Sequence, residues 1–409
     1  MERIEAGLLL PGADAPVLDA VLVADGGAIS YAGPASSAPA TPAAIVTSAA
    51  VVMPGLWDCH GHFMGARSFD LARLPQEPVA LRAARCARDL ANALNAGVTS
   101  VREVGGLGVY LGRAVSEGIL DGPSIYAAGA ILSTTGGHGD LHCYPLSFVT
   151  DFAREDGTLR LADGAAECAR AVREQLRRGA RLIKVCASGG VLSELDSPIH
   201  QQFTSAELRA IVEVAGLADR VVAAHCHGKP GIMAAIEAGV ATIEHGSYLD
   251  EEACDAMVET GTILVPTRTI IEDILENIAD VPTYAAAKLI ALAATHADAV
   301  RLAIERGVTV AMGTDISMTG ADLPNSWGRN GSEVAHLVTL GMTPLQAIAA
   351  ATAVGPRTLG PQAPRSGQLA AGFDADFITL DADPLADVTV LAQPDRVTGV
   401  WIAGRKVKG

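Results

Sequence analysis

Two histidines separated by a single residue occur twice in this 409-residue chain, in the segments DCHGH and AAHCHG. The first pair is His60 and His62, and the second pair is His225 and His227. Each pair closes an apolar run that reads as a buried strand, and alternate residues of a strand point to the same side. Two convergent imidazoles suit a divalent transition metal. The spacing therefore predicts metal binding, although H-x-H alone also arises often by chance.

Two more apolar runs end in side chains of the same chemical kind. His245 stands in TIEHGS, and Asp315 ends the run in AMGTDIS. Asp58 lies on the same strand face as the first histidine pair and is expected to orient a ligand from behind it. Taken alone, each histidine has an ordinary explanation as a core or capping residue. Together they predict a metal site, provided that the fold brings these strand ends to one place.

Lys184 lies inside the apolar run LIKVCA, where a buried ammonium group is costly unless something compensates it. An ammonium would also repel bound metal. A carbamate, formed from the neutral amine and CO2, is instead an anionic oxygen ligand able to bridge two metals, and burial near metal favours the neutral amine. The alternative is a lysine that extends to solvent from the rim of the fold.

A helical run, a glycine and a β-rich run recur along the chain, with the glycines at positions 97, 179, 239, 261 and 307. Each glycine fits the left-handed position after a helix, and the following run fits a buried parallel strand. The segment TSAE, residues 204–207, predicts a capping box at the start of another helix. About eight strands between residues 54 and 320 predict a closed (β/α)8 barrel, in which all strand ends meet at one mouth. The alternative, an open doubly wound sheet, usually carries a glycine-rich phosphate loop after its first strand, and the chain has none there.

The chain is longer than one barrel of about 250 residues needs, and its two ends have a different pattern. Residues 1–53 and 365–409 contain short apolar runs broken by Gly, Pro, Ala and Ser. We assign both ends to one small β-sandwich domain and residues 54–364 to the metal-binding barrel. Within the barrel, the helical stretch that runs to residue 306 leaves a loop-rich segment, 270–284, that is expected to cover the mouth.

The composition narrows the classes of partner. The net charge of −16 disfavours nucleic acid and anionic membranes, because both require a basic patch, but it leaves small anionic substrates open. The first residues show neither a signal peptide nor a membrane-spanning run. Seven scattered cysteines without a CxxC pair predict reduced thiols and a cytoplasmic location.

With these residues in view, the chain resembles the amidohydrolase superfamily, in its binuclear branch with a carboxylated lysine. The resemblance covers nearly the whole length, from MPGLWDCHGH through Lys184, His225, His245 and Asp315 to the closing GQLAAGFDADFITLDADPL. The segment STTGGHGD, residues 133–140, is typical of a subgroup of dipeptidases and carboxypeptidases that act on Xaa-Pro or on C-terminal Lys or Arg. That subgroup also includes ochratoxin-type amidases and often forms large homo-oligomers.

The resemblance implies two divalent metal ions. Zinc suits the ligands best, and related sites also accept manganese or cobalt. The ligands of the more buried ion would be His60, His62 and Asp315. His225 and His245 would bind the more exposed ion, and the Lys184 carbamate and a hydroxide would bridge the pair.

Other residues are implied to contact the substrate. His138 would polarise the scissile carbonyl, and His227 would bind substrate rather than metal, although spacing alone leaves open which of His225 and His227 is the ligand. Arg268, in LVPTRTI, is predicted to share the substrate's carboxylate with His227 through a bidentate fork. The alternative pairs Arg268 with the acidic residues 272 and 273 at the surface.

The expected reaction is hydrolysis of an amide or peptide bond, in a dipeptide or N-acyl amino acid with a free carboxylate, by attack of the bridging hydroxide. Asp315 would accept the proton of the hydroxide and pass it to the leaving amine. The cysteines at 59 and 226 alternate with the histidines, so they are expected to be packing residues and not nucleophiles.

Three other functions compete with this one. The first is hydrolysis of a carbamate, urea, cyclic amide, phosphoester or ochratoxin-like amide, which the sequence barely distinguishes. The second is a mononuclear deaminase, which would not need Lys184 and commonly carries a Glu that HCHG lacks. The third is a binding protein without activity, but such proteins tend to lose ligands and this chain keeps all of them.

Overall fold

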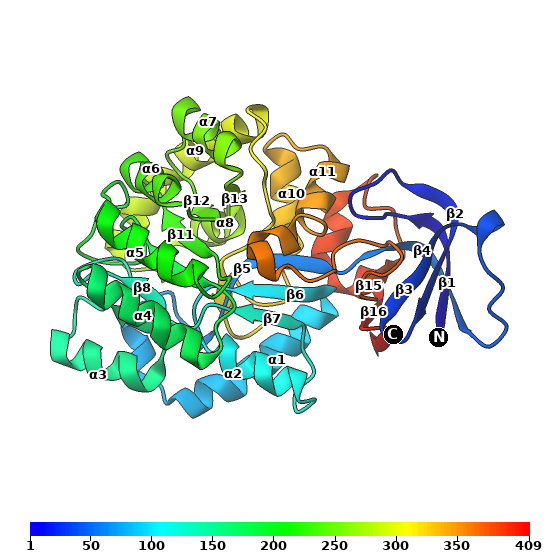
Figure 1. The fold of residues 1–409 in the computed structure, drawn as a ribbon, viewed down its shortest axis with the longest axis horizontal. Helices are drawn as coiled ribbons and strands as arrows, with labels where there is room; N and C mark the ends of the chain where they lie inside the picture. Colours follow the sequence, from blue (N-terminus) through cyan, green and yellow to red (C-terminus); the bar gives the residue numbers. More distant parts are fainter.

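Parallel strands surrounded by helices form the larger part of the molecule (Figure 1). The computed structural model describes all residues from 1 to 409. Seven of the eight positions around the barrel are filled by β5 (Leu56–Ala66), β6 (Val98–Glu103), β7 with β8 (Ser124–Ala127 and Ile131–Ser133), β10 (Ile183–Cys186), β11 (Val222–Cys226), β12 (Thr242–His245) and β13 (Ile263–Val265). β7 pairs with β6 and β8 pairs with β10, so these two short strands together occupy one position.

Residues 309–315 fill the eighth position and close the barrel. Val310 pairs with Leu264 of β13, and the amide of Cys59 in β5 donates to the carbonyl of Met312 at 2.9 Å. A short strand, β14 (Ile316–Met318), continues the pairing with β5. The expected (β/α)8 barrel is confirmed, and β9 (Leu159–Leu161) adds an edge strand beside β8.

Local signals in the sequence set the ends of the helices. α4 (Ala165–Arg178), α6 (Lys229–Ala238) and α7 (Glu251–Thr260) each stop at a glycine with positive φ, as expected at positions 179, 239 and 261. α5 (Ser205–Gly216) starts at the capping box formed by Thr204 and Glu207. The other helices outside the mouth are α1 (Val79–Asn95), α2 (Gly108–Ser116), α3 (Leu146–Asp156), α10 (Ser332–Thr339) and α11 (Pro344–Ala350).

The two chain ends form one small β-domain, as expected, and the termini lie close together on it (Figure 1). Hydrogen bonds join its seven strands into a single mixed sheet in the order β17-β16-β15-β4-β1-β2-β3. Phe377 stacks on Trp401 in its separate core, with ring centroids 4.7 Å apart. The strands are β1 (Glu2–Leu9), β2 (Val17–Asp25), β3 (Ala28–Pro34), β4 (Ile45–Pro54), β15 (Phe377–Leu380), β16 (Val397–Ile402) and β17 (Arg405–Lys408). The boundaries after residue 53 and before residue 365 stay predictions.

The segment expected to be a loop over the mouth is largely helical. α8 (Arg268–Glu276) and α9 (Thr283–Glu305) flank a short 3-10 turn at Ile278–Asp280. Ile270, Ile271 and Ile274 have helical spacing and are buried in an apolar cluster separate from the barrel core. Burial of that face explains why the segment is a helix rather than a loop.

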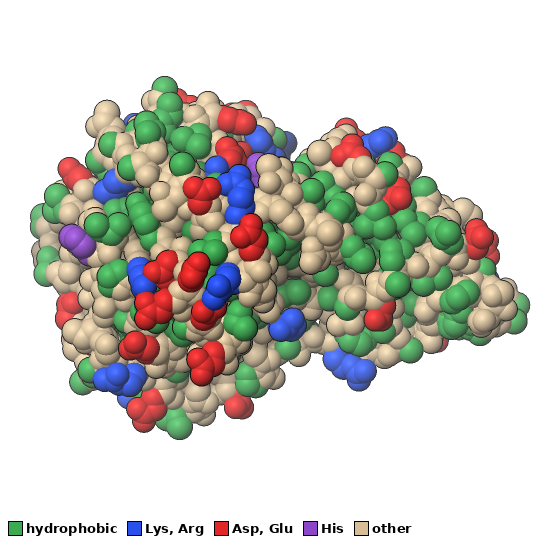
Figure 2. Space-filling model, turned by 90° about the horizontal axis from the view of Figure 1, so that it is seen from above, with side chains coloured by type: hydrophobic (Ala, Val, Ile, Leu, Met, Phe, Trp, Pro, Cys, Tyr) green, Lys and Arg blue, Asp and Glu red, His purple; other side chains and the backbone are tan.

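Acidic and basic side chains both lie on the surface. In Figure 2 the molecule has a larger and a smaller lobe, and on this face basic side chains are interspersed with acidic ones. No helix combines the length and the hydropathy needed to cross a membrane.

Candidate metal centre

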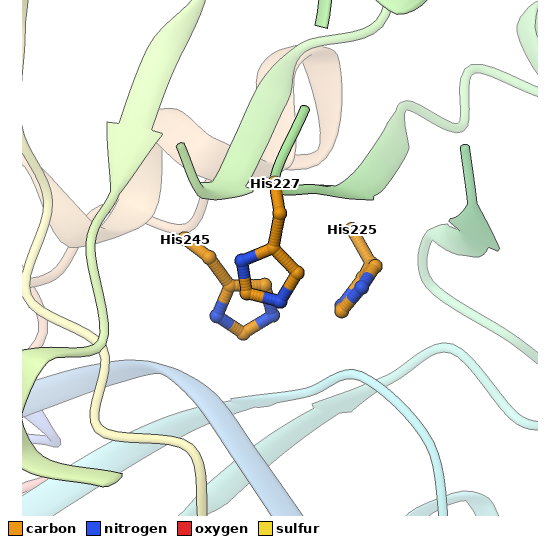
Figure 3. Close-up of side chains that lie close together, drawn as sticks. All are labelled: His225, His227 and His245. Carbon is orange, nitrogen blue, oxygen red and sulfur yellow. The ribbon is translucent and has the colours of Figure 1, made fainter. Parts of the chain in front are cut away.

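Two clusters of metal-binding side chains meet at the carboxyl ends of the barrel strands. The first contains His60, His62 and Asp315, and the second contains His225, His227 and His245. In each cluster the candidate ligand atoms lie within 4.8 Å of one another. The rings of His60 and His245 have centroids 5.0 Å apart, so the clusters adjoin. Figure 3 shows the three histidines of the second cluster projecting into the same space.

The first cluster is held from behind by hydrogen bonds that its Nδ1 atoms donate. His60 Nδ1 lies 2.6 Å from a carboxylate oxygen of Glu244, and His62 Nδ1 lies 2.8 Å from the carbonyl oxygen of Gly105. Both Nε2 atoms are turned to Asp315, whose Oδ1 lies 3.5 Å from that of His60 and 3.0 Å from that of His62. This is the arrangement in which outer hydrogen bonds fix imidazole ligands to a metal.

The second cluster is held in the same way, with one difference. His227 Nδ1 lies 2.7 Å from Ser247 Oγ, and His245 Nδ1 lies 2.6 Å from Thr267 Oγ1. His225 instead uses Nε2, which lies 3.1 Å from the carbonyl oxygen of Gly189. Its remaining nitrogen for a metal is therefore Nδ1, whereas the other two histidines keep Nε2.

Burial keeps four of these five imidazoles neutral. It lowers the pKa of His60 to about 4 and that of His227 to about 3, and it places the pKa values of His225 and His245 well below the ordinary value. For His62, burial acts in the same direction, but the hydrogen bond and the charge of Asp315 outweigh it and raise the pKa. Metals bind the neutral imidazole, so a buried and hydrogen-bonded set of this kind is ready to coordinate. Nitrogen donors with a carboxylate fit divalent zinc, manganese or cobalt. The two clusters are therefore consistent with a binuclear metal centre.

Lys184 lies on β10 and lines the same cavity as both clusters. Its side chain is only 2% exposed, and burial lowers the pKa of its amine. The neighbouring carboxylates are committed elsewhere, Asp315 to His62 and Glu244 to Arg102. A buried amine without its own counter-ion favours the neutral form, which is the form that reacts with CO2.

A buried ion pair under the first cluster was not predicted from the sequence. One Arg102 nitrogen lies 2.7 Å from both carboxylate oxygens of Glu244, and the side chains of both residues are fully buried. Burial alone would raise the pKa of Glu244, but the Arg102 guanidinium and His60 hold that pKa well below its ordinary value. Glu244 thus stays ionised and fixes the His60 ring. Charged residues inside the apolar strands SVREV and TIEH were the signal for it.

Backbone strain is concentrated at the same place. His245, Thr267 and Asp315 have φ values of 71°, 54° and 59°, in the left-handed region that residues other than glycine rarely adopt. Such strain persists only where the surroundings enforce it, and it clusters at functional sites.

His138 also lies at the mouth, as expected from the sequence. Its ring stacks on that of His225 with centroids 4.3 Å apart, and its Nδ1 lies 2.8 Å from Ser193 Oγ. It lines the cavity above the two clusters. Burial lowers its pKa to about 4, so the ring is neutral at pH 7.

The cavity above the clusters contains about 840 Å³ of space between protein atoms, part of it open to solvent. Eleven of its twenty lining residues are hydrophobic, so the walls are apolar and the floor is polar. α8 and α9 supply Ile270, Ile271, Ile274, Leu289 and Leu292, and other parts of the chain supply Met64, Leu71, Ile131, Val191 and Leu192. A site of this size and character suits a small molecule with a bulky apolar part.

Arg268 does not line this cavity. It begins α8, is 9% exposed, and its guanidinium donates to Glu272 at 2.8 Å and to the carbonyl oxygen of Ala293 at 2.8 Å. The pairing with Glu272 matches the alternative expected from the sequence. It differs in one respect, because the Arg268 side chain is largely buried and only Glu272 reaches the surface. The structure therefore brings together all the other expected site residues and leaves this one outside.

The remaining expectations at the strand ends concern Asp58 and two cysteines. Asp58 accepts hydrogen bonds from the amide of His60 at 3.0 Å and from the side-chain amide of Asn330 at 2.7 Å, so it supports a ligand from behind. Cys59 and Cys226 are buried in apolar clusters away from the cavity lining. Burial raises the pKa of the Cys59 thiol to about 12, as befits a packing residue.

Comparison with known proteins agrees with this geometry. Residues 51–407 match the family described as the amidohydrolase family. An ochratoxinase of Aspergillus niger is 43% identical over 423 aligned residues, which cover 99% of this chain and 86% of that protein. Its crystal structure has a TM-score of 0.92 at 42% identity, covering 100% of this chain and 95% of that one.

Prolidases are also similar in structure. A Xaa-Pro dipeptidase with bound methionine in its active site has a TM-score of 0.88 at 32% identity and full coverage of both chains. A prolidase complexed with N-methylphosphonate-L-proline has a TM-score of 0.89 at 31% identity, covering 100% of this chain and 99% of that one. The chain therefore belongs to the amidohydrolase family, as a metal-dependent hydrolase whose candidate ligands meet at the barrel mouth.

Proposed function

We propose that this protein hydrolyses the amide bond of a dipeptide or N-acyl amino acid, with two divalent metal ions at the barrel mouth. The observation that carries the proposal is the pair of adjoining clusters at the floor of an apolar cavity, with Lys184 in the same lining. We assign His60, His62 and Asp315 to one ion and His225 and His245 to the other. Zinc fits the nitrogen-rich donor set best.

We propose that Lys184 is carboxylated and supplies an oxygen ligand shared by the two ions. Its support is chemical: the amine is buried, its pKa is lowered by burial, and the nearest carboxylates are committed to other partners. A carbamate would place one negative charge where the ammonium would place one positive charge. That change favours the binding of cations at this site.

When bound, the two ions would lower the pKa of a water molecule and polarise the substrate carbonyl. The residues of the chain do the remaining work. Asp315, whose Oδ1 faces both His60 and His62, would accept a proton and deliver it to the nitrogen of the leaving amine. We propose that His138, whose Nδ1 lies 2.8 Å from Ser193 Oγ, carries its proton on Nε2 and would donate it in a hydrogen bond to the carbonyl oxygen.

Recognition of the substrate divides into an apolar and a polar part. The isoleucines of α8 and the leucines of α9 would pack against a bulky acyl or side-chain group. His227, which lines the cavity, is proposed to contact the carboxylate of the substrate. Arg268 would have to break its hydrogen bonds to Glu272 and Ala293 to reach the substrate carboxylate. We therefore assign this contact to His227 alone.

The test is a library of dipeptides and N-acyl amino acids, assayed with zinc and bicarbonate present. Each good substrate is compared with its C-terminal amide. The free acid should be preferred at least tenfold, because only the acid offers a charged group to His227, and His227→Asn should reduce that preference. Turnover of carbamates, ureas or cyclic amides with no cleavage of any linear amide would contradict the proposal.

A second candidate is an ochratoxin-like amide with an aromatic acyl group. It is favoured by the similarity to the A. niger ochratoxinase and by the predominance of apolar residues in the cavity walls. The same assay with ochratoxin A separates it from a general dipeptidase, since a dipeptidase without this specificity would leave ochratoxin A intact.

We also propose a homo-oligomeric, cytoplasmic protein whose partners are small-molecule substrates. All seven cysteines are free, and six of them are buried, which agrees with a reducing compartment. Light scattering on the purified protein tests the assembly, and a single 41.9 kDa species would contradict it.

A further inference from the structure

One loop, residues 188–203 between β10 and α5, holds His138 in place. Ser193 Oγ lies 2.8 Å from Nδ1 of the ring, and Gln202 Oε1 accepts from the amide of His138 at 3.0 Å. The ring packs directly over Gly190, where a Cβ atom would lie 2.1 Å from its Nδ1 and Cε1 atoms. Residue 190 must therefore lack a side chain for the ring to occupy this position.

Asp196 organises the same loop from within. Its Oδ2 accepts from the amide of Gly190 at 2.8 Å and from Nε2 of Gln202 at 3.1 Å. Gly190 and Gln202 are two of the residues that contact His138. The carboxylate thus fixes both of them, and its side chain is only 5% exposed.

Lys288, which lies on α9 outside the loop, completes this arrangement. Its Nζ donates to the carbonyl oxygens of Ser193 at 2.6 Å and Gly190 at 3.1 Å, and lies 3.4 Å from Oδ1 of Asp196. The side chain is 17% exposed. One cation therefore neutralises the buried carboxylate and binds the backbone of the two residues that contact the His138 ring.

We infer that Lys288 is a positioning residue for His138. It acts through Ser193 and Gly190, whose carbonyl groups it fixes, and it joins the loop 188–203 to α9, the helix that supplies Leu289 and Leu292 to the cavity wall. The role of His138 in turnover rests on the proposed function, whereas the control of its ring position does not. Without Lys288 the loop loses three contacts at once, and a displacement of about 1 Å of a catalytic group lowers the rate by on the order of 10²-fold.

The experiment is a double-mutant cycle on the metal-loaded protein. Lys288→Met should lower kcat by about 10- to 100-fold in the parent, with metal content unchanged. In the His138→Asn background the same change should cost less than about twofold, because the group that it positions is already absent. Lys288→Arg should restore much of the activity. Lys408→Met is the matched control, because Lys408 donates to two backbone carbonyls, of Asn95 and Pro394, far from the cavity.

Nuclear magnetic resonance on histidine-labelled protein gives a readout that does not depend on turnover. The ring nitrogen signals of His138, assigned by comparison with His138→Asn, should shift in Lys288→Met and in Ser193→Ala, but not in Lys408→Met. Unshifted signals, or an equal loss of kcat in the parent and in the His138→Asn background, would overturn the inference. If Lys288→Met fails to fold, Lys288→Gln, which removes the charge and shortens the side chain but keeps a polar end, carries the same two tests. A shifted signal in a protein that cleaves no amide would leave the positioning role intact and reject the proposed function alone.

Discussion

Each of the five histidines in the two clusters has one ring nitrogen hydrogen-bonded to a protein group behind it and the other ring nitrogen facing the metal site. The bonded partner is a carboxylate for His60, a backbone carbonyl for His62 and His225, and a hydroxyl for His227 and His245. These bonds fix ring orientation before any metal arrives. Metal affinity should therefore depend on the outer residues as well as on the ligands.

Lys184 is the residue on which the binuclear proposal depends most. Lys184→Ala should lose metal and nearly all activity, because the variant lacks the shared oxygen ligand. Short carboxylic acids should restore part of the activity by occupying the vacated space. Metal analysis and kinetics with added acetate or propionate measure both effects, and an unmodified ammonium at position 184 beside two bound ions would refute the carbamate.

Asp315 is proposed to act both as ligand and as proton carrier. Asp315→Asn keeps the size of the side chain but removes its charge and basicity. We expect a folded variant that retains at least one metal ion and whose kcat is lower by roughly 10²–10⁴-fold, the usual contribution of general acid–base catalysis. Steady-state kinetics at matched metal content are the measurement, and a kcat within tenfold of the parent would rule out the second role.

The sequence predicted the single residues at the mouth well, because each lies at the end of an apolar run and the barrel brings those ends together. Of the groups behind them it predicted Asp58 but not the others. Arg102 pairs with Glu244 across strands that are 142 residues apart, and Lys288 reaches a loop about 95 residues earlier. Pairing of this kind depends on three-dimensional neighbours, which the spacing in one chain does not encode. The position of Arg268 was missed for the same reason, since its buried partner Ala293 lies on another helix.

At the scale of elements, α8 is held by a side chain from another helix. The carboxylate of Glu333, on α10, accepts from the amides of Arg268 at 2.9 Å and Thr269 at 2.7 Å. The residue before α8, Thr267, makes no side-chain cap of its own. Glu333 therefore takes the place of an N-cap for the helix that carries the isoleucines of the cavity wall.

Removal of this cap should loosen α8. Glu333→Ala leaves two buried amides without partners, which we expect to lower the free energy of unfolding by about 2–3 kcal/mol. Because α8 forms a wall of the cavity, KM for apolar substrates should rise and amide exchange in residues 268–276 should quicken. Glu207→Ala, which removes a capping partner of α5, is the matched control. An equal change in KM for both variants would show that α8 has no special role.

The helix ends were predictable, whereas the helix over the mouth was not. Glycines 179, 239 and 261 stop their helices with positive φ because the signal is local. α8 begins at a strained Thr267 and depends on Glu333, some 65 residues later. Its start therefore carries no local signal, although Ile270, Ile271 and Ile274 inside the segment have helical spacing.

At the scale of the molecule, the stability of the small β-domain should depend on pH through Asp376. Burial raises the pKa of this carboxyl from 3.8 to about 6, and the nearby charge of Asp374 adds to the effect. As pH rises from 4 to 6, the unfolded chain ionises Asp376 and the native state does not, so the native state loses stability. Asn at this position keeps the acceptor for the amide of Ala403 and has no proton to lose.

The expected result is a difference that grows with pH. The free energy of unfolding of Asp376→Asn, relative to the parent, should increase by about 3 kcal/mol between pH 4 and pH 7, the equivalent of two pKa units. Urea unfolding at both pH values measures it. Equal differences at the two pH values would mean that the carboxyl titrates alike in the folded and unfolded chain.

Metal removal tests the coupling between the site and the whole fold. The candidate ligands come from β5, β11, β12 and the closing segment 309–315, so they converge only when the barrel is closed. Ions that bind the folded chain alone stabilise it by about 4 kcal/mol at a thousandfold excess over Kd. A chelator should therefore abolish activity and lower Tm by several degrees, and zinc should reverse both changes.

The amount of zinc that the metal-free protein takes up again should depend on bicarbonate. When zinc is added back in CO2-free buffer, the protein should bind fewer than two zinc ions per chain, because Lys184 then lacks the carbamate that both ions would share. Added bicarbonate should raise the zinc content to two ions per chain. Lys184→Ala should show no response to bicarbonate, which separates carbamate formation from a general effect of the anion. Metal analysis measures the zinc bound per chain, and calorimetry measures the recovery of Tm. A parent protein that binds two zinc ions fully without CO2 would contradict the carbamate while leaving the histidine clusters as the metal site.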